Sequence, residues 1–530
     1  MQQRTTLALV ALLGALGTGC GSSDSDDAQG TGGGATGGTG GTGGTGGTGG
    51  GLSALALAPG QVAEIALEQG QGPVRLATPA GTEKYVLILA STLLDASTDA
   101  HTYSVSTAGS PTWKADLVSS CSLTPDKWKN AAIAPETPPS GSGAKVGDKR
   151  SIVVGLPAGS EAIDAEAIAV GSAAVVWKDV TAAHPAVLDA AFVQEFLADF
   201  EKTILPRARA VFGVESDADN DGHVQLVFSP LTHKTAVAFF TSCDLAKGLG
   251  CPGGNAGEYL YLTPPNAIDP PYNTPNAIKE ILAHELSHMI HFNRKVLKNA
   301  LLGWNESAYM GEGVGAFAQD VLGYQSGNLY VTKAGLDGIG GFSLGQTLGD
   351  SVEYDLSRDG VLRGGSYLFV RWLYDRAGGD LAKLDGSVDN QGGIALLRKL
   401  LDAPESIAAA LPATAGAPIE TLAADFWTTL AMSNRDVDGG PAPENPCFAY
   451  LPTASDPVTT RQRGANLFAS FHGQQMKGPK LQSLSEADGS IEAGGGELIS
   501  VDAVSGQAEL SVGVTVAAAA APRVRIGRIE

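Results

Sequence analysis

Two histidines and a glutamate that lie close together carry the clearest chemistry in this chain. The stretch His-Glu-Leu-Ser-His runs from His284 to His288. Residues four apart on a helix share one face, so both imidazoles can reach one metal ion. Glu285 would lie beside that metal and take a proton from metal-bound water. The pattern predicts a zinc site with Glu285 as general base.

The surrounding sequence predicts the helix that must position this motif. Thr274 and Pro275 are typical of an N-cap and a first-turn proline. Apolar residues then recur at helical spacing: Ile278, Ile281, Leu282, Met289 and Phe292. The alternative is that both histidines belong to an ordinary core and bind no metal.

A catalytic zinc usually has three protein ligands and one open position. Two downstream glutamates, Glu306 and Glu312, are separated by about 240° around a helix, so one helix cannot aim both at one metal. Glu312 lies near Gly315 and Ala316, small residues that would let its helix approach the histidine helix closely. We predict Glu312 as the third ligand. Glu306 is the second choice, or a residue that orients a ligand histidine.

With these motifs the chain resembles the hyicolysin-type zinc metallopeptidases of the gluzincin group, whose third ligand is a downstream glutamate. The resemblance rests on residues 284–293 and 312–319, with shorter fragments at 204–213, 258–262 and 366–373. It extends over roughly residues 148 to 435. It implies an α+β peptidase domain that uses zinc and acts on a protein or peptide.

The chain also departs from that family. Gly311 stands where such enzymes often have asparagine. The run Arg363-Gly364-Gly365 stands where the resemblance leads us to expect a tyrosine that stabilises an oxyanion. Tyr354, Tyr367 and the histidines outside the motif are alternative candidates for that role.

Length and charge limit the other classes of function. A chain of 530 residues is long enough for two or three domains. The formal net charge of −21, without any Lys/Arg-rich stripe, argues against binding to nucleic acid or to an anionic membrane surface.

The N-terminal residues predict export. Arg4 precedes an apolar run from Leu7 to Leu16 that is too short to span a bilayer. Small residues then lead to Cys20, as in a bacterial lipoprotein signal peptide covering residues 1–19. We expect a lipid on Cys20 that anchors the protein at the cell surface or in the periplasm, or secretion with Cys20 free. The Gly/Thr-rich residues 20–52 are typical of a flexible tether.

Four further cysteines, an even number, suggest disulfides in an exported protein. Cys243 and Cys251 enclose a short Gly-rich loop, and we expect them to pair. Cys121 would then pair with Cys447 and join the two ends of the chain.

The predicted fold class is α+β, with a gluzincin-like zinc peptidase domain flanked by smaller β-sandwich-like domains. We expect an N-terminal β-domain at 53–147, the peptidase domain at 148–435 and a C-terminal β-domain at 436–530. Within the peptidase domain, strands are predicted at 151–154, 173–177 and 224–228, and helices at 188–203 and 366–377.

A second motif has the spacing of a calcium loop. Asp217, Asp219 and Asp221 occupy positions one, three and five, and Gly222 occupies position six. Position twelve is Phe228 instead of the usual glutamate, so the loop is incomplete. A calcium site and a plain Asp/Gly turn remain the two interpretations.

Together these patterns predict a zinc-dependent endopeptidase of extracellular proteins. The alternatives are a non-catalytic cell-surface binding lipoprotein that keeps the peptidase fold, and a metal hydrolase of non-peptide substrates. Glu285 argues against the first alternative, because a purely structural site needs no general base.

Overall fold

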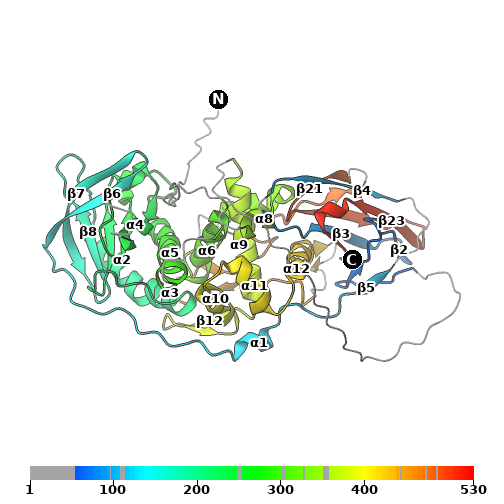
Figure 1. Ribbon diagram of the computed structural model, residues 1–530, viewed down its shortest axis with the longest axis horizontal. Coiled ribbons are helices and arrows are strands. Elements are labelled where there is room, and N and C mark those ends of the chain that lie inside the picture. The colour runs from blue at the N-terminus through cyan, green and yellow to red at the C-terminus, as the bar shows by residue number, and fades with distance from the viewer. Residues whose placement is uncertain are drawn as a thin grey trace, which may run out of the picture.

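The computed structural model describes residues 54–530, apart from 96, 108–113, 247–252, 300–305, 326–328, 350–351, 353–356, 438–439, 442–444, 472–473 and 485–486. A six-stranded sheet, a group of helices and a β-sandwich follow one another along the longest axis of the molecule (Figure 1). This mixture of helices and sheets agrees with the predicted α+β class. Cys20 and its tether lie outside the described residues.

The two ends of the chain fold into one β-sandwich. Its larger sheet has the order β20-β22-β3-β24-β1-β5, and its smaller sheet has the order β2-β23-β4-β21. The N-terminal strands are β1 (Val62–Ile65), β2 (Val74–Ala77), β3 (Lys84–Ser91), β4 (Ala100–Ser106) and β5 (Ala115–Leu117). The C-terminal strands are β20 (Gln482–Ser483), β21 (Asp488–Glu492), β22 (Gly496–Asp502), β23 (Glu509–Val516) and β24 (Pro522–Arg528).

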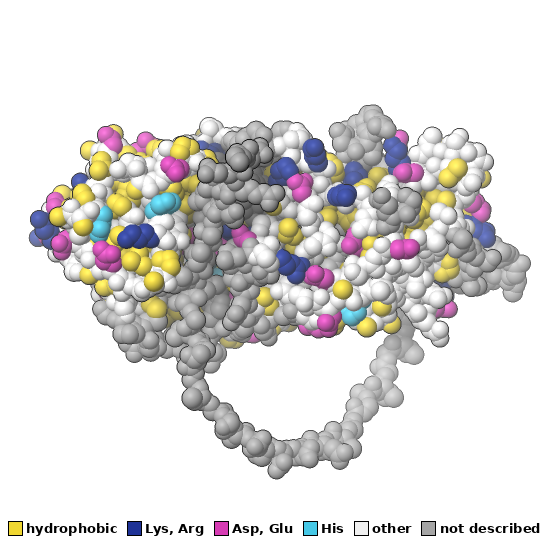
Figure 2. Space-filling model, turned by 90° about the horizontal axis from the view of Figure 1, so that it is seen from above, with side chains coloured by type: hydrophobic (Ala, Val, Ile, Leu, Met, Phe, Trp, Pro, Cys, Tyr) yellow, Lys and Arg dark blue, Asp and Glu magenta, His cyan; other side chains and the backbone are white. Residues whose placement is uncertain are grey.

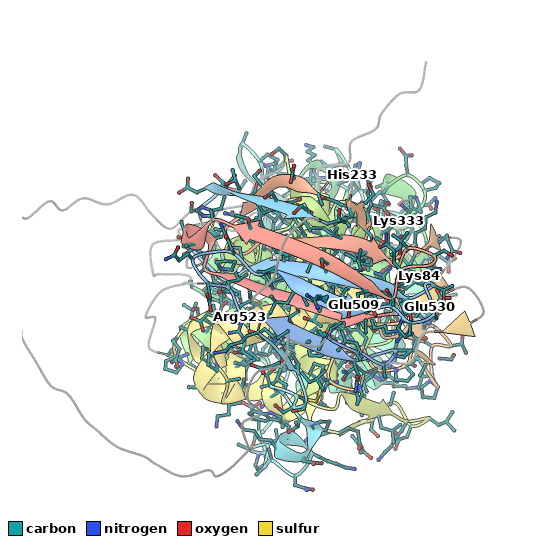
Figure 3. All side chains as sticks on the ribbon, turned by 90° about the vertical axis from the view of Figure 1, so that its right-hand side faces the viewer. Lys84, His233, Lys333, Glu509, Arg523 and Glu530 are labelled. Carbon is teal, nitrogen blue, oxygen red and sulfur yellow. A yellow bond between two sulfur atoms is a disulfide. The ribbon has the colours of Figure 1, made fainter. Side chains whose placement is uncertain are left out.

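This arrangement corrects the prediction of two separate β-domains at 53–147 and 436–530. Strand β3 lies between β22 and β24, so Leu87 pairs with both Ile499 and Ile526. Figure 3 shows the blue N-terminal and red C-terminal strands interleaved, and Lys84 forms an ion pair with Glu530 at 2.8 Å. Each segment alone would leave strand edges and an apolar face uncovered, so the two segments complete one core together.

The second large sheet belongs to the predicted peptidase domain and has the order β10-β11-β9-β8-β7-β6. Its strands are β6 (Lys149–Leu156), β7 (Gly159–Val170), β8 (Ala174–Asp179), β9 (Val224–Phe228), β10 (Ala238–Phe240) and β11 (Tyr259–Leu262). The three strands predicted here, at 151–154, 173–177 and 224–228, are confirmed. Strands β8, β9 and β11 run parallel, and β10 is antiparallel to β11.

Helices fill the space between this sheet and the sandwich (Figure 1). They are α2 (Ala190–Asp199), α3 (Leu205–Val211), α4 (Ser242–Leu245), α5 (Pro275–Phe292), α6 (Ala308–Val321), α7 (Leu329–Asp337), α8 (Leu344–Leu348), α9 (Asp359–Arg376), α10 (Gly393–Asp402), α11 (Ile407–Ala415) and α12 (Ile419–Met432). A π-helical turn at Phe200–Ile204 joins α2 to α3, so the helix predicted at 188–203 is present in two parts. The helix predicted at 366–377 is the second half of α9.

The segment between the sandwich and the sheet holds these parts together. It contains α1 (Pro125–Lys129) and continues to Glu136, which forms ion pairs with Arg294, Lys298 and Arg398. A short hairpin of β12 (Asp380–Ala382) and β13 (Val388–Asn390) follows α9. The remaining strands are two-residue pairs: β14 (Asp436–Val437) with β15 (Gly440–Pro441), β16 (Ala454–Ser455) with β17 (Gln462–Arg463), and β18 (Ser470–Phe471) with β19 (Gln474–Gln475).

The predicted disulfide between Cys121 and Cys447 is confirmed. Cys243 is also disulfide-bonded, and its predicted partner, Cys251, lies outside the described residues. Among the described residues no single helix is long and apolar enough to span a membrane, although α11 and α12 meet that test together as a sharply bent pair.

The face shown in Figure 2 carries a mixture of charged side chains. Lysine and arginine side chains are scattered among acidic ones there, and no basic stripe gathers on the described part of that face.

Candidate metal centre

Helix α5 carries the His-Glu-Leu-Ser-His motif. The Thr274 Oγ1 accepts a hydrogen bond from the Ala277 backbone N–H at 3.2 Å, and Pro275 occupies the first turn, as the sequence predicted. His284 and Glu285 are buried, while His288 is partly exposed. The helix therefore presents both imidazoles on one face and keeps the site largely out of water.

Helix α6 carries Glu312 and begins at a second cap. The Ser307 Oγ accepts from the Tyr309 backbone N–H at 3.1 Å and donates to the carbonyl of Gln346 on α8 at 2.6 Å. The backbone N–H of Leu344, at the start of α8, donates to Gly494 in the sandwich at 3.0 Å. The sandwich thus supports the start of the helix that carries the predicted third ligand.

Glycine permits the close approach of α6 to α5. A Cβ on Gly315 would lie 2.5 Å from the His284 Cε1, which no ordinary side-chain contact tolerates. A Cβ on Gly313 would lie 2.9 Å from Ser366 on α9. Small residues at these two positions let α6 pack tightly between its neighbours, which agrees with the role predicted for Gly315.

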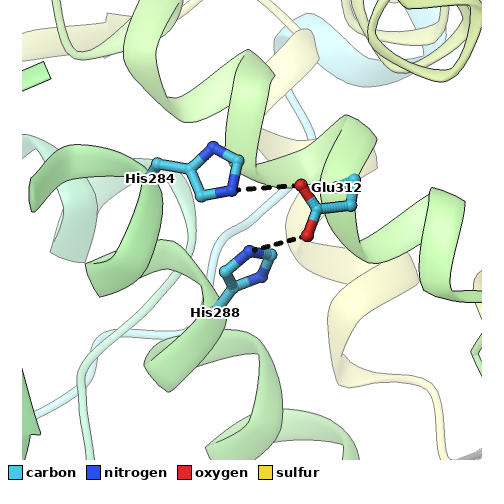
Figure 4. A group of neighbouring side chains, drawn as sticks. All are labelled: His284, His288 and Glu312. Carbon is cyan, nitrogen blue, oxygen red and sulfur yellow. Dashed lines mark ion pairs between the residues drawn. The ribbon is translucent and has the colours of Figure 1, made fainter. Parts of the chain in front are cut away.

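The three predicted ligands converge (Figure 4). The His284 Nε2 lies 3.4 Å from the Glu312 Oε2, and the His288 Nε2 lies 3.7 Å from the Glu312 Oε1. One donor atom from each residue lies within 4.8 Å of the other two. Helices α5 and α6 therefore bring together two imidazole nitrogens and one carboxylate, as the sequence predicted.

The protonation states suit metal binding. Burial, together with the nearby His284, lowers the pKa of His288 to about 3, so the imidazole of His288 is neutral at pH 7. Burial acts to raise the pKa of Glu312, but Arg363 and the two imidazoles outweigh it and hold that pKa well below its usual range. A neutral imidazole and an ionised carboxylate are the forms that bind a metal.

The donor set fits zinc. The His288 Nε2 is buried and makes no hydrogen bond within the described part of the chain. A buried polar atom without a partner is costly, and a metal ion would satisfy it. Two imidazoles and one carboxylate are also a recurring ligand set of catalytic zinc.

Glu285 lies beside this cluster and faces the sheet. Its Oε2 accepts a hydrogen bond from the backbone N–H of Phe240, on the edge strand β10, at 3.0 Å. Burial raises the pKa of Glu285 to about 7, and the charge of Glu312 adds to that rise. A carboxyl group that changes charge near neutral pH is suited to general acid–base work.

Glu306 occupies a different place. Its Oε1 accepts from the backbone N–H of Ile407, at the start of α11, at 2.6 Å, and lies 3.6 Å from the Lys295 Nζ. These contacts direct its carboxylate toward α11, and the described cluster of metal donors does not include it. The structure thus separates the two glutamates, because Glu306 precedes α6 whereas Glu312 lies within it.

Several candidates for the oxyanion role are engaged in other contacts. The Tyr367 hydroxyl donates to the Asp320 Oδ2 at 3.0 Å inside the protein, and Tyr354 lies outside the described residues. Outside the motif, His184 pairs with Asp179 and Glu161, and His223 contacts the Asp221 backbone. Arg363, which the sequence marked only as a departure from the family, lies 3.0 Å from the Glu312 Oε2 through its Nε.

The aspartate loop forms a second acidic group. Asp217 and Asp219 come together with Glu258, while Asp221 accepts from the backbone N–H of His223 and the side chain of Gln225. The sequence analysis did not predict Glu258 as a member of this acidic group. It precedes β11, whose parallel pairing with β9 places it beside the loop: the Gln225 backbone N–H donates to its carbonyl at 2.7 Å.

Burial raises the pKa of Glu258 to about 7. Burial and the charge of Asp221 raise the pKa of Asp219 as well. Crowded carboxylates of this kind resist carrying their charges together. Calcium stays a prediction at this loop, with Asp217, Asp219 and now Glu258 as its candidate ligands.

The chain matches no protein-family model and no curated protein. The assignment of function therefore depends on the residues and geometry of the two clusters.

Proposed function

We propose that the chain is a zinc-dependent endopeptidase. The main support for this proposal is the convergence of His284, His288 and Glu312, with Glu285 beside them. Two imidazoles, one carboxylate and an adjacent general base match the requirements of metal-assisted hydrolysis. Export and a lipid anchor at Cys20 would direct the activity toward proteins outside the cytoplasm.

His284, His288 and Glu312 would hold the metal. When bound, zinc supplies a Lewis acid that polarises the scissile carbonyl and acidifies water. The hydrogen bond from Phe240 fixes the Glu285 Oε2 and leaves the Oε1 to accept the proton of the attacking water. The oxygen of this water forms a C–O bond to the scissile carbonyl carbon. Glu285 then delivers the proton to the leaving amide nitrogen as the C–N bond breaks.

The test is digestion of casein and of a quenched fluorescent peptide by the purified full chain. We expect cleavage that a chelator abolishes and that zinc restores. Glu285→Gln should abolish cleavage while the protein keeps its metal. Glu420→Gln, which changes an exposed glutamate on α12, is the matched control and should cleave like the wild type.

The outcomes separate the three classes of function. Zinc binding without turnover of either substrate would support a binding lipoprotein. Hydrolysis of simple esters, but of neither peptide nor casein, would support a metal hydrolase of non-peptide substrates. Chelator-resistant cleavage that survives Glu285→Gln would exclude the proposed site.

A further inference from the structure

Arg363 on α9 contacts the predicted carboxylate ligand directly. Its Nε lies 3.0 Å from the Glu312 Oε2, and both side chains are about 2% exposed. The same oxygen faces His284, whereas the Oε1 faces His288. One edge of the carboxylate is thus held by a fixed cation, and the other edge is left facing the second imidazole.

Close helix packing places Arg363 there. A Cβ on Gly365 would lie 2.1 Å from the ring of Phe342, and a Cβ on Gly335 of α7 would lie 2.8 Å from the backbone of Gly364. Helix α9 can lie flush against α7 and Phe342 only because these positions lack side chains. Arg363 precedes two of these glycines on α9, is buried, and reaches Glu312.

A second acid lies near the other end of the guanidinium. Asp359, one turn earlier on α9, lies 3.8 Å from the Arg363 Nη1 through its Oδ2. Arginine stays charged under all ordinary conditions and presents its donors in a rigid plane. Asp359 and Glu312 thus place negative charge on two sides of the guanidinium.

A buried carboxylate needs such a partner. Taking an ion out of water is strongly unfavourable unless another group compensates its charge. Arg363 supplies that compensation. The carboxylate can therefore stay oriented toward both imidazoles before any metal arrives.

We propose that Arg363 is a positioning residue that pre-orients Glu312 for the metal. This inference rests on the proposed function, since it treats His284, His288 and Glu312 as the ligands. It gives the Arg363-Gly364-Gly365 run a role different from that of an oxyanion-stabilising tyrosine. Groups that orient a ligand typically contribute about 10–100-fold to metal affinity.

The test is zinc competition against a chromogenic chelator, together with the absorption spectrum of the cobalt-substituted protein. Arg363→Gln should weaken zinc binding about 10–100-fold and change the cobalt spectrum. Arg363→Lys keeps the charge without the planar contact and should restore part of the affinity. Arg358→Gln, which removes one cation near the start of the same helix, should bind zinc like the wild type.

Circular dichroism confirms that each variant is folded. If Arg363→Gln fails to fold, Arg363→Lys and Asp359→Asn decide the question, and each should weaken zinc binding. Folded Arg363 variants that bind zinc as tightly as the wild type, or more tightly, would overturn the positioning role. A wild-type protein that binds no zinc would instead refute the proposed function itself.

Discussion

Gly315 on α6 faces the ring of His284 on α5, and a Cβ at this glycine would lie 2.5 Å from the imidazole Cε1. The imidazole can face Glu312 only while this contact stays free of a side chain. The ligand geometry therefore depends on a residue that has no functional group of its own.

Gly315→Ala should separate the two helices or displace the imidazole. Overpacking of this kind lowers folding stability by about 1–3 kcal/mol. Here it would also displace His284, a predicted ligand. We expect a fall in both the melting temperature and the zinc affinity, measured by calorimetry and chelator competition. Gly341→Ala is the control, because a Cβ there meets nothing within 4 Å. An alanine at 315 that leaves zinc affinity unchanged would contradict this account of the helix contact.

Purified protein should contain about one zinc per chain, because the described residues form one cluster with two histidines and a carboxylate. His284→Ala and His288→Ala should each lose it. Elemental analysis after dialysis against metal-free buffer measures the content. Full zinc content in the double variant would refute the site.

The two glutamates should respond differently to substitution. Glu312→Gln removes a charged ligand while keeping the side-chain shape, and should weaken zinc binding by more than the roughly 100-fold expected of an orienting group. Glu306→Ala should retain zinc but unfold more easily, because it leaves Lys295 buried without its carboxylate partner. Losing one member of a buried ion pair costs about 3–5 kcal/mol.

Chemical denaturation and zinc competition on both variants distinguish these effects. Loss of zinc in a folded Glu306→Ala protein, with retention in Glu312→Gln, would transfer the ligand assignment to Glu306.

Local patterns predicted the parts of the structure that depend on nearby residues. The Thr274 cap and helical periodicity define α5, and the spacing of His284 and His288 fixes their common face. The small residue at 315 indicated how α6 could approach. Each of these signals lies within one or two turns of helix, where sequence distance and spatial distance agree.

Features that depend on contacts between residues far apart in the chain could not be predicted from the sequence. The pairing of Leu87 with Ile499 and Ile526 has no local signal, so one sandwich was predicted as two domains. Glu258 reaches the aspartate loop only through the pairing of β11 with β9. Arg363 meets Glu312 only because α9 packs against α6. Such contacts are set by the packing of whole elements.

The acidic loop predicts a specific pH dependence of stability. Burial raises the pKa of Glu258 from its ordinary value of 4.5 to about 7, so the folded state disfavours the charged form. Between these values the folded protein binds more protons than the unfolded chain, and stability falls as pH rises. The full shift corresponds to a loss on the order of 3 kcal/mol.

Glu258→Gln should remove this dependence. Glutamine keeps an oxygen for the hydrogen bond from the Ala218 backbone N–H, but it cannot ionise. The free energy of unfolding of the wild type, relative to this variant, should therefore decrease from about pH 4.5 to about pH 7 and level off above. Urea denaturation across this range measures the difference, with Glu420→Gln as an exposed control.

Added calcium should restore the stability of the wild type near pH 7 and leave that of Glu258→Gln little changed, because a divalent cation offsets the repulsion among carboxylates. A difference that does not vary with pH would show that Glu258 is not the titrating group, and a calcium response equal in both proteins would exclude it as a ligand.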